Sequence, residues 1–515
     1  MCRPGRPASI GGMEKTRIRW LRVIGGLFAA VAIVIGVVAG GVVYAWQSAR
    51  VDTAGQVRFD RRLAIPPLAA STIAPDGTRE FDLELRSGTT DLGHGPGTET
   101  WGVNGSYLGP TVRAERGEPV RMNVRNGLDE ASTLHWHGMH LPAAMDGGPH
   151  QMVDPGTTWS PQWTVDQPAA TLWYHPHLHG ATAEHVYRGV AGMFLVDDPA
   201  GPVLPDRYGI DDVPVIVQDK KFDGDRLDDG AAMFSDTGVL GDEVLVNGTP
   251  GPYLDVTTER VRLRLLNASN ARVYRFGFDT GLGFELIGTD GGLLPKPVEM
   301  TSLQLSPGER AEIVVAVPAG TSPVLRSTPP DLGADFWGTR FAGGADTMDI
   351  LQLRAADRLE SNAVVPSALA APADLGVPSV TREFDLTSST QINGKSMDMG
   401  RIDEVVTIGT TEVWEVRNVS GGVHNFHVHD VQFQVLDTDD PALTGPKDTV
   451  YLPPGRTLRL LMRFTDFSDP STPYMFHCHL LRHEDNGLMG QFVVVEPGQR
   501  PVPPPPPSDA ARGHH

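Results

Sequence analysis

One segment near the C-terminal end of the chain reads His477-Cys478-His479-Leu480-Leu481-Arg482-His483. Successive side chains of a β-strand point to opposite faces. If this segment begins on a strand, the imidazoles of His477 and His479 share one face, and the sulfur of Cys478 leaves from the other. The segment therefore predicts a β-strand that serves two different sites, one on each face.

Three further pairs of histidines share this spacing. The four pairs are His135/His137, His175/His177, His427/His429 and His477/His479. On strands, each pair can project two imidazoles toward one metal ion or toward two adjacent ions. Together they supply eight imidazoles, which is more than one ion can bind. The pattern predicts a cluster of about three metal ions with two or three imidazoles each.

The sulfur of Cys478 belongs to a different site. His424 lies an odd number of residues from His427 and His429, so on a regular strand it also points away from that pair. His483 follows shortly after the cysteine. One Cys with two His is the ligand set of a trigonal blue-copper electron-transfer site. The alternative is that Cys478 is a buried structural thiol.

The chain repeats itself around these clusters. Asn-Gly pairs occur at Asn104-Gly105, Asn247-Gly248 and Asn393-Gly394, and Pro-Gly pairs that precede alternating strands occur at Pro155-Gly156, Pro307-Gly308 and Pro454-Gly455. Both markers step by roughly 145 to 150 residues, which is the size of a domain. We expect three copies of one β-domain, each a β-sandwich or barrel.

The three copies differ in their potential ligands. The first has His175-Pro176-His177 where the third has His477-Cys478-His479, so a proline occupies the position of the thiolate. The second has no histidine in the segment that follows Asn267. The metal cluster is therefore expected between the first and third copies, with the second as a spacer that holds them in position.

Composition and charge exclude several classes of protein. With 58 Gly and 43 Pro, a mainly helical chain is not expected. The formal net charge is -20; residues 1–50 carry seven Arg or Lys and one Glu, which leaves -26 on residues 51–515. Such an acidic body would repel a phosphate backbone, so no nucleic-acid partner is expected. Two cysteines, Cys2 and Cys478, do not make a disulfide framework.

The N-terminal segment predicts a membrane anchor. Residues 23–46 form an uncharged apolar run that is long enough to cross a bilayer, and residues 1–22 before it are basic. The basic flank should stay in the cytoplasm, which places the rest of the chain on the extracytoplasmic side, at the cell surface or in the periplasm. The alternative is a cleaved signal peptide. Residues 47–74 are expected to be a linker.

Taken together, these motifs resemble the multicopper oxidases of the three-cupredoxin-domain type, and most closely the bacterial copper efflux oxidases and laccase-like enzymes. The resemblance covers roughly residues 75 to 498. It implies an all-β fold of three consecutive cupredoxin-like Greek-key domains at residues 75–200, 201–360 and 375–498, after the N-terminal transmembrane segment. Residues 499–515 would be a Pro-rich tail.

The same resemblance implies four copper ions and a role for each cluster. The type 1 copper would take His424, Cys478 and His483; the type 2 copper would take His135 and His427; the paired type 3 coppers would take His137, His175, His177, His429, His477 and His479. Asp146 and Glu484 match the family's proton-relay positions, and the alternative is that either is an ordinary turn or surface acid. The axial position of the type 1 copper is Leu488, which cannot coordinate, unless a shift of the loop brings Met489 onto the metal.

The implied activity is the one-electron oxidation of a reductant at the type 1 copper and the four-electron reduction of O2 to water at the trinuclear cluster. The reductant is Cu(I), in a role in copper tolerance, or a small phenolic or aromatic molecule. Met397 and Met399 are candidate soft ligands for Cu(I), although gap-filling core methionines are the alternative. The other functions considered are a laccase without a copper-detoxification role and a non-enzymatic copper-binding protein. A monomer is expected.

Overall fold

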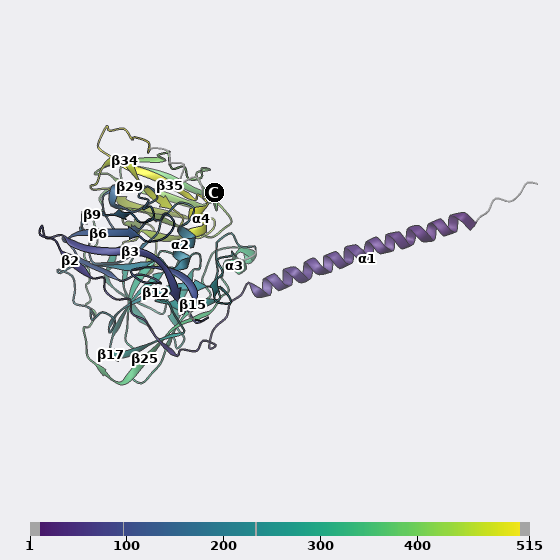
Figure 1. The fold of residues 1–515 in the computed structure, drawn as a ribbon, viewed down its shortest axis with the longest axis horizontal. Helices are drawn as coiled ribbons and strands as arrows, with labels where there is room; N and C mark the ends of the chain where they lie inside the picture. The colour runs from purple at the N-terminus through teal and green to yellow at the C-terminus, as the bar shows by residue number, and fades with distance from the viewer. Residues whose placement is uncertain (1–10, 96, 232–233, 505–515) are drawn as a thin grey trace, which may run out of the picture. The chain divides into compact units, whose positions relative to one another are not determined.

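The structure is a computed structural model that describes residues 11–95, 97–231 and 234–504 (Figure 1). The first part of the predicted basic segment and the end of the Pro-rich tail lie outside these residues. Helix α1 (Gly11–Ser48) lies in one unit, and the described residues from 51 to 504 belong to a second, compact unit. Residues 19–48 of α1 are long and apolar enough to cross a membrane, as the sequence predicts.

Domain 1 is a sandwich of two sheets. One sheet has the order β2 (Ser71–Ile73), β3 (Arg79–Thr90), β6 (Pro119–Asn126) and β8 (Thr158–Trp159), with β4 (Thr98–Val103) paired to β3 and β9 (Gln162–Thr164) paired to β6; the other has the order β5 (Val112–Glu115), β11 (Gly192–Asp197), β10 (Ala170–His175) and β7 (His135–His137). Strand β6 shows why these strands pack as a sandwich. Val120, Met122 and Val124 are buried on one face, and the polar residues between them face outward.

Domain 2 has two larger sheets. One has the order β16 (Thr249–Pro250), β15 (Glu243–Val246), β12 (Asp212–Lys220), β18 (Val261–Asn267), β23 (Arg310–Val315), β20 (Phe284–Thr289) and β21 (Gly292–Met300); the other has the order β1 (Arg61–Arg62), β17 (Pro252–Thr258), β25 (Met348–Glu360), β24 (Val324–Thr328), β19 (Tyr274–Phe278) and β22 (Ser302–Leu305). A small hairpin, β13 (Phe222–Asp223) and β14 (Arg226–Leu227), and helix α3 (Phe336–Phe341) complete it. Strand β18 is buried along its whole length, so both of its faces are covered.

Domain 3 repeats the plan of domain 1. Its sheets have the orders β27 (Gln391–Ile392), β26 (Val380–Ser388), β29 (Thr411–Asn418), β33 (Thr457–Arg463), β31 (Phe433–Val435), and β28 (Glu404–Thr407), β35 (Met489–Val495), β34 (Asp469–His477), β30 (His424–Val428), β32 (Thr449–Leu452). Short helices lie beside the sandwiches: η1 (Ala143–Met145) and α2 (Thr182–Arg188) in domain 1, and η2 (Pro441–Leu443) and α4 (Leu481–Asp485) in domain 3. The expected all-β fold of three repeated domains is confirmed.

The two sequence markers have the same structural role in each domain. The side chains of Asn104, Asn247 and Asn393 each accept a backbone N–H of a neighbouring strand at 2.7 to 2.8 Å, and all three residues have a positive φ, which Asn tolerates. In the second marker, the N–H of Gly156, Gly308 and Gly455 donates to the carbonyl of Asn126, Asn267 and Asn418, respectively. The repeats therefore preserve strand-end geometry.

The segment expected as a linker is partly ordered against the domains. The N–H of Val51 donates to Asp346 at 2.9 Å, β1 pairs in parallel with β17, and β2 pairs with β3. The open edges of the two sheets offer unpaired N–H and C=O groups, which an extended chain satisfies. Residues 51–74 thus extend both domains.

Candidate metal centre

The histidine pairs lie at the ends of equivalent strands in domains 1 and 3. In domain 1, β7 runs antiparallel to β10 and places His135 opposite His175. In domain 3, β30 runs antiparallel to β34 and places His427 opposite His477. The fold thus brings the four pairs together, and every one of their imidazoles is at most 1% exposed. We call the eight residues of these pairs the eight-histidine site.

The ring nitrogens of this site converge in three groups. The Nε2 atoms of His177, His429 and His477 lie 3.1 to 3.3 Å from one another. A second group joins Nε2 of His175 to Nδ1 of His137 at 3.3 Å and to Nε2 of His479 at 3.4 Å. A third consists of the Nε2 atoms of His135 and His427, which are buried without a hydrogen-bond partner among the described residues.

These groups are suited to hold metal ions. Burial lowers the pKa of His177 to about 3 and holds the pKa of His175, His477 and His479 well below its ordinary value of 6.5. Neutral imidazoles whose lone pairs point at a common place repel one another unless a cation lies between them. The donor chemistry of these neutral, buried imidazoles therefore fits copper.

The two predicted proton-relay residues lie at the outer edge of this site. Asp146 accepts the Nδ1–H of His429 at 2.8 Å through its carboxylate and that of His135 at 2.9 Å through its carbonyl. The carboxylate of Glu484 lies 3.3 Å from Nδ1 of His177 and 3.2 Å from Nδ1 of His477. Both acids are about 1% exposed, so neither is a surface residue. Burial raises the pKa of Glu484.

The sulfur of Cys478 lies in a separate site, as its alternation with His477 and His479 predicts. The sulfur of Cys478 lies 3.6 Å from Nδ1 of His424 and 3.5 Å from Nδ1 of His483, and these two nitrogens are 3.1 Å apart. We call His424, Cys478 and His483 the Cys478 site. Burial raises the pKa of the Cys478 thiol to about 12. A bound cation is therefore needed to displace its proton at neutral pH.

The strand register distinguishes between the two axial candidates. Met489 pairs with His477 across β34 and β35, so its side chain shares the face of His477. Leu488 is buried in the same apolar cluster as Cys478, and its carbonyl accepts the N–H of that cysteine at 3.1 Å. This register favours Leu488 beside the sulfur.

The two candidate methionines for Cu(I) lie along the segment that follows β27, beside the loop after the Cys478 site. The N–H of Met397 donates to the carbonyl of Gly487 at 2.9 Å, and the carbonyl of Met399 accepts the side-chain amide of Gln491 at 3.2 Å. Met397 is half-buried, and Met399 belongs to the same stretch of chain.

Sequence reasoning missed two polar groups beside the eight-histidine site. Asp448 accepts the Nε2–H of His137 at 3.0 Å, and its carbonyl accepts the Nδ1–H of His427 at 2.8 Å. Arg310 of domain 2 donates to both carboxylate oxygens of Asp448. Neither residue stands in a histidine motif, so no local pattern could reveal them.

His140 also has a defined role that its sequence context does not show. Its Nδ1–H donates to Asp430 and its Nε2–H to Asp466, each at 2.7 Å. Burial alone would lower the pKa of this imidazole, but the two carboxylates raise it to about 10. His140 therefore acts as a charged clamp between domains 1 and 3 rather than as a member of the histidine groups.

Comparison with known proteins gives matches along most of the chain. Family models described as multicopper oxidase match residues 84–201, 218–322 and 371–498. A multicopper oxidase of Staphylococcus haemolyticus is 34% identical over 84% of this chain and 92% of its own length. The cell division protein FtsP of Escherichia coli is 35% identical over 79% of this chain and 87% of its own length.

Solved structures agree with these matches. A laccase from Pediococcus acidilactici is 34% identical, with a TM-score of 0.77 over 85% of this chain and 95% of that protein. A laccase-like multi-copper oxidase from Ochrobactrum sp. is 33% identical, with a TM-score of 0.75 over 84% of this chain and all of that protein. The likeness spans all three domains.

Proposed function

This chain belongs to the multicopper oxidase family of copper-dependent oxidoreductases, and from this membership we propose that it couples the oxidation of a one-electron reductant at the Cys478 site to the reduction of O2 to water at the eight-histidine site. Copper, when bound, supplies the one-electron chemistry at the first site and the oxygen chemistry at the second. One observation supports this proposal above all. At the end of β34, His477 and His479 belong to the eight-histidine site, and Cys478 between them belongs to the Cys478 site.

We assign the copper ligands as the resemblance implies. His424, Cys478 and His483 would hold the type 1 copper; His135 and His427 the type 2 copper; His137, His175, His177, His429, His477 and His479 the type 3 pair. The three groups of converging ring nitrogens and the separate Cys478 site support this assignment.

The polypeptide supplies a short electron path between the sites. Cys478 is covalently joined to His477 and His479, and Nδ1 of His477 lies 3.2 Å from the carbonyl of Cys478. Asn425 links the two faces as well, because its side-chain oxygen lies 3.5 Å from the sulfur and accepts the N–H of His479 at 2.5 Å. The two sites are therefore separate in space but connected by a short path of covalent bonds and hydrogen bonds.

Asp146 and Glu484 would move protons to the eight-histidine site. The carboxylate of Asp146 lies against Nδ1 of His429 and of His135. The carboxylate of Glu484 lies against Nδ1 of His177 and of His477. Oxygen reduction consumes one proton per electron, so buried carboxylates at this edge are suited to hold protons and deliver them.

Two reductants remain as candidates, and Cu(I) is the one that Met397 and Met399 favour. Thioether sulfur is a soft ligand that selects Cu(I), and the backbone of Met397 contacts Gly487, next to Leu488. A phenolic or aromatic reductant, without a role in copper tolerance, is the second candidate. A non-enzymatic copper-binding role is disfavoured because all ten histidine positions and Cys478 retain ligand chemistry.

Oxygen uptake with Cu(I) and with a phenol tests these alternatives. We expect the Met397→Leu, Met399→Leu double variant to lose uptake with Cu(I) and to keep uptake with the phenol. Met300→Leu, which replaces a half-buried methionine of domain 2, is the matched control. Unchanged uptake with Cu(I) in the double variant would assign these residues to packing. If neither reductant supports uptake by the copper-loaded parent, the oxidase proposal is wrong.

We propose that α1 anchors the protein, with residues 51–515 on the extracytoplasmic side. The apolar length of residues 19–48 and the basic residues before them support this orientation. Membrane fractionation of the full chain, followed by protease treatment of intact cells or spheroplasts, tests it. Recovery of the full chain in the soluble fraction would exclude a retained anchor.

A further inference from the structure

The Pro-Gly turn of domain 2 differs from its two counterparts. A methyl group added at Gly156 or Gly455 would meet nothing within 4 Å. One added at Gly308 would lie 3.0 Å from the imidazole ring of His479. The carbonyl of Pro307, in the same turn, accepts the side-chain amide of Asn425 at 2.8 Å. A turn that has open space around it in the other two domains is therefore packed against the proposed copper ligands in domain 2.

Arg310 follows this turn and uses all five of its side-chain N–H donors. Its Nε donates to the carbonyl of Thr171, and its two terminal nitrogens donate to the carbonyls of Gly308 and Asp290 and to both carboxylate oxygens of Asp448. The guanidinium is fully buried. It thus joins domain 1 through Thr171, domain 2 through its own turn and domain 3 through Asp448, beside the eight-histidine site.

The carboxylate that Arg310 holds determines the orientation of one histidine. In the other seven histidines of the site, Nε2 is the inward nitrogen, and Nδ1 is turned outward. His137 is reversed: its Nδ1 lies 3.3 Å from Nε2 of His175, and its Nε2–H donates to Asp448 at 3.0 Å. The acceptor on Asp448 therefore selects both the tautomer and the ring orientation of His137.

The contact between Asp448 and His137 is tightly enclosed by neighbouring groups. A methyl group at Gly138, the next residue, would lie 2.6 Å from Arg310 and from Asp448, and the positive φ of 86° also favours glycine there. The hydroxyl of Thr449 donates to Asp448 at 2.8 Å and lies 3.1 Å from Nε2 of His137. The carboxylate of Asp448 is thus held from several sides.

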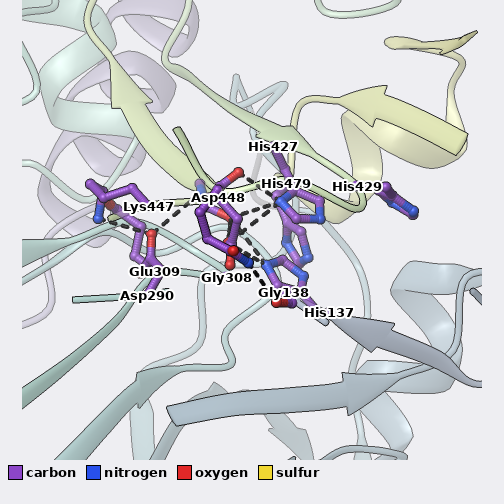
Figure 2. Close-up of polar contacts among 12 residues, drawn as sticks. His137, Gly138, Asp290, Gly308, Glu309, His427, His429, Lys447, Asp448 and His479 are labelled. Atoms are coloured by element: carbon purple, nitrogen blue, oxygen red, sulfur yellow. Dashed lines mark hydrogen bonds and ion pairs between the residues drawn. The ribbon is translucent and has the colours of Figure 1, made fainter. Parts of the chain in front are cut away.

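A second buried cation, Lys447, lies beside the pair of Arg310 and Asp448 (Figure 2). Figure 2 shows Lys447, Glu309 and Asp290 on one side of Asp448 and the imidazoles of His137 and His427 on the other. The ammonium group of Lys447 lies 3.0 Å from both Asp290 and Glu309. With Arg310 and Asp448, these residues make two cations and three carboxylates, all buried. The residual negative charge beside the histidines favours a cation among them.

We propose that Arg310 of domain 2 is a positioning residue of the copper cluster, which holds Asp448 so that His137 presents Nδ1, and not Nε2, to the metal. Domain 2 is then more than a spacer: it supplies no ligand but sets the orientation of one. The inference rests on the proposed ligand set, in which His137 belongs to the type 3 pair.

Arg310→Lys tests this role, because lysine keeps the charge but not the planar set of five donors. We expect the folded variant to lose type 3 copper selectively. Its copper would dissociate to a competing chelator at about 10- to 100-fold lower chelator concentration. The fraction of copper detected by electron paramagnetic resonance would rise above that of the parent, because the coupled type 3 pair is silent when intact. The visible absorption of the Cys478 site would stay unchanged.

Arg264→Lys is the matched control. Arg264 is a buried arginine of domain 2 that pairs with Asp212 and Glu312 and, like Arg310, binds Thr171 of domain 1, in this case through the side-chain hydroxyl. We expect this variant to keep the copper content and spectrum of the parent. Equal copper loss in both variants would show a general effect of the domain interface and overturn the proposal, as would parent-like copper binding in Arg310→Lys.

Asp448→Asn is the second variant, used also if Arg310→Lys does not fold. It has the same shape, but its amide cannot accept from Arg310 and from His137 without placing a donor against a donor. We expect the same selective copper loss, and full retention of coupled copper would contradict the proposal. A parent that binds no copper would instead refute the ligand assignment itself.

Discussion

Asp146 of domain 1 accepts a hydrogen bond from His429 of domain 3 at 2.8 Å, across 283 residues of sequence. The same residue accepts the Nδ1–H of His135 through its carbonyl. One acid therefore contacts histidines from both domains that form the eight-histidine site. Asp146 thus orients two imidazoles, and in the proposed function its carboxylate also moves protons to the eight-histidine site.

Asp146→Asn separates these roles. The amide oxygen can still accept from His429, so we expect normal copper content, whereas the loss of the ionisable group should slow oxygen reduction about 100-fold. Anaerobic electron uptake at the Cys478 site should not change. Stopped-flow reoxidation of the reduced protein by O2 measures the first rate, and anaerobic bleaching by the reductant measures the second. Parent-like reoxidation would remove Asp146 from the proton path.

Cys478→Ser should uncouple the two sites. Serine has nearly the same shape but is a poor ligand for copper, so the intense visible absorption of a thiolate bound to Cu(II) should vanish. Oxygen uptake with either reductant should fall to background, while the eight-histidine site keeps its copper. Metal analysis and optical spectra check both outcomes. A variant that keeps its reductant oxidation would place electron entry elsewhere.

Leu488→Met should lower the reduction potential of the type 1 copper. The register places Leu488 on the face of Cys478, where a thioether can act as a weak axial ligand, and a weak axial ligand stabilises Cu(II) relative to Cu(I). Redox titration of the visible band measures the change. Met489→Leu is the matched control, since Met489 shares the face of His477. In this variant the reduction potential of the type 1 copper should equal that of the parent. A large shift in the control variant instead would identify Met489 as the axial residue.

The His140 clamp should make stability depend on pH. Its pKa is raised from about 6.5 in the unfolded chain to about 10, so its stabilising contribution is complete below pH 6.5 and is lost as the pH rises to about 10. We expect His140→Gln to destabilise the copper-free protein by about 2 to 4 kcal/mol at pH 6 and by much less at pH 10. Thermal unfolding at the two pH values measures the difference. An equal cost at both would show that packing, not charge, is lost.

The histidine groups show how much of the site follows from local spacing alone. The alternation of His477, Cys478 and His479 separates two sites because neighbouring side chains on a strand face opposite ways, and this is a local property of the backbone. The repeated Asn-Gly and Pro-Gly pairs predict three domains because each requires the same left-handed or tight turn. The pairing of β1 and β2 within the predicted linker does not follow in this way, because it depends on sheet edges that form far away in sequence.

By itself, then, the sequence determined the class of fold, the separation of the four histidine pairs from Cys478 and the family to which the chain is similar, because short-range spacing on strands carries all three. Only the tertiary structure decided that Asp448 meets His137, 311 residues away, and that Arg310 meets Asp448, 138 residues away. It also decided that one Pro-Gly turn of three lies against the histidines. The physical reason is that a charged side chain can be buried only where partners of opposite charge and hydrogen-bonding groups compensate its charge. The packing of the domains against one another brings those partners together.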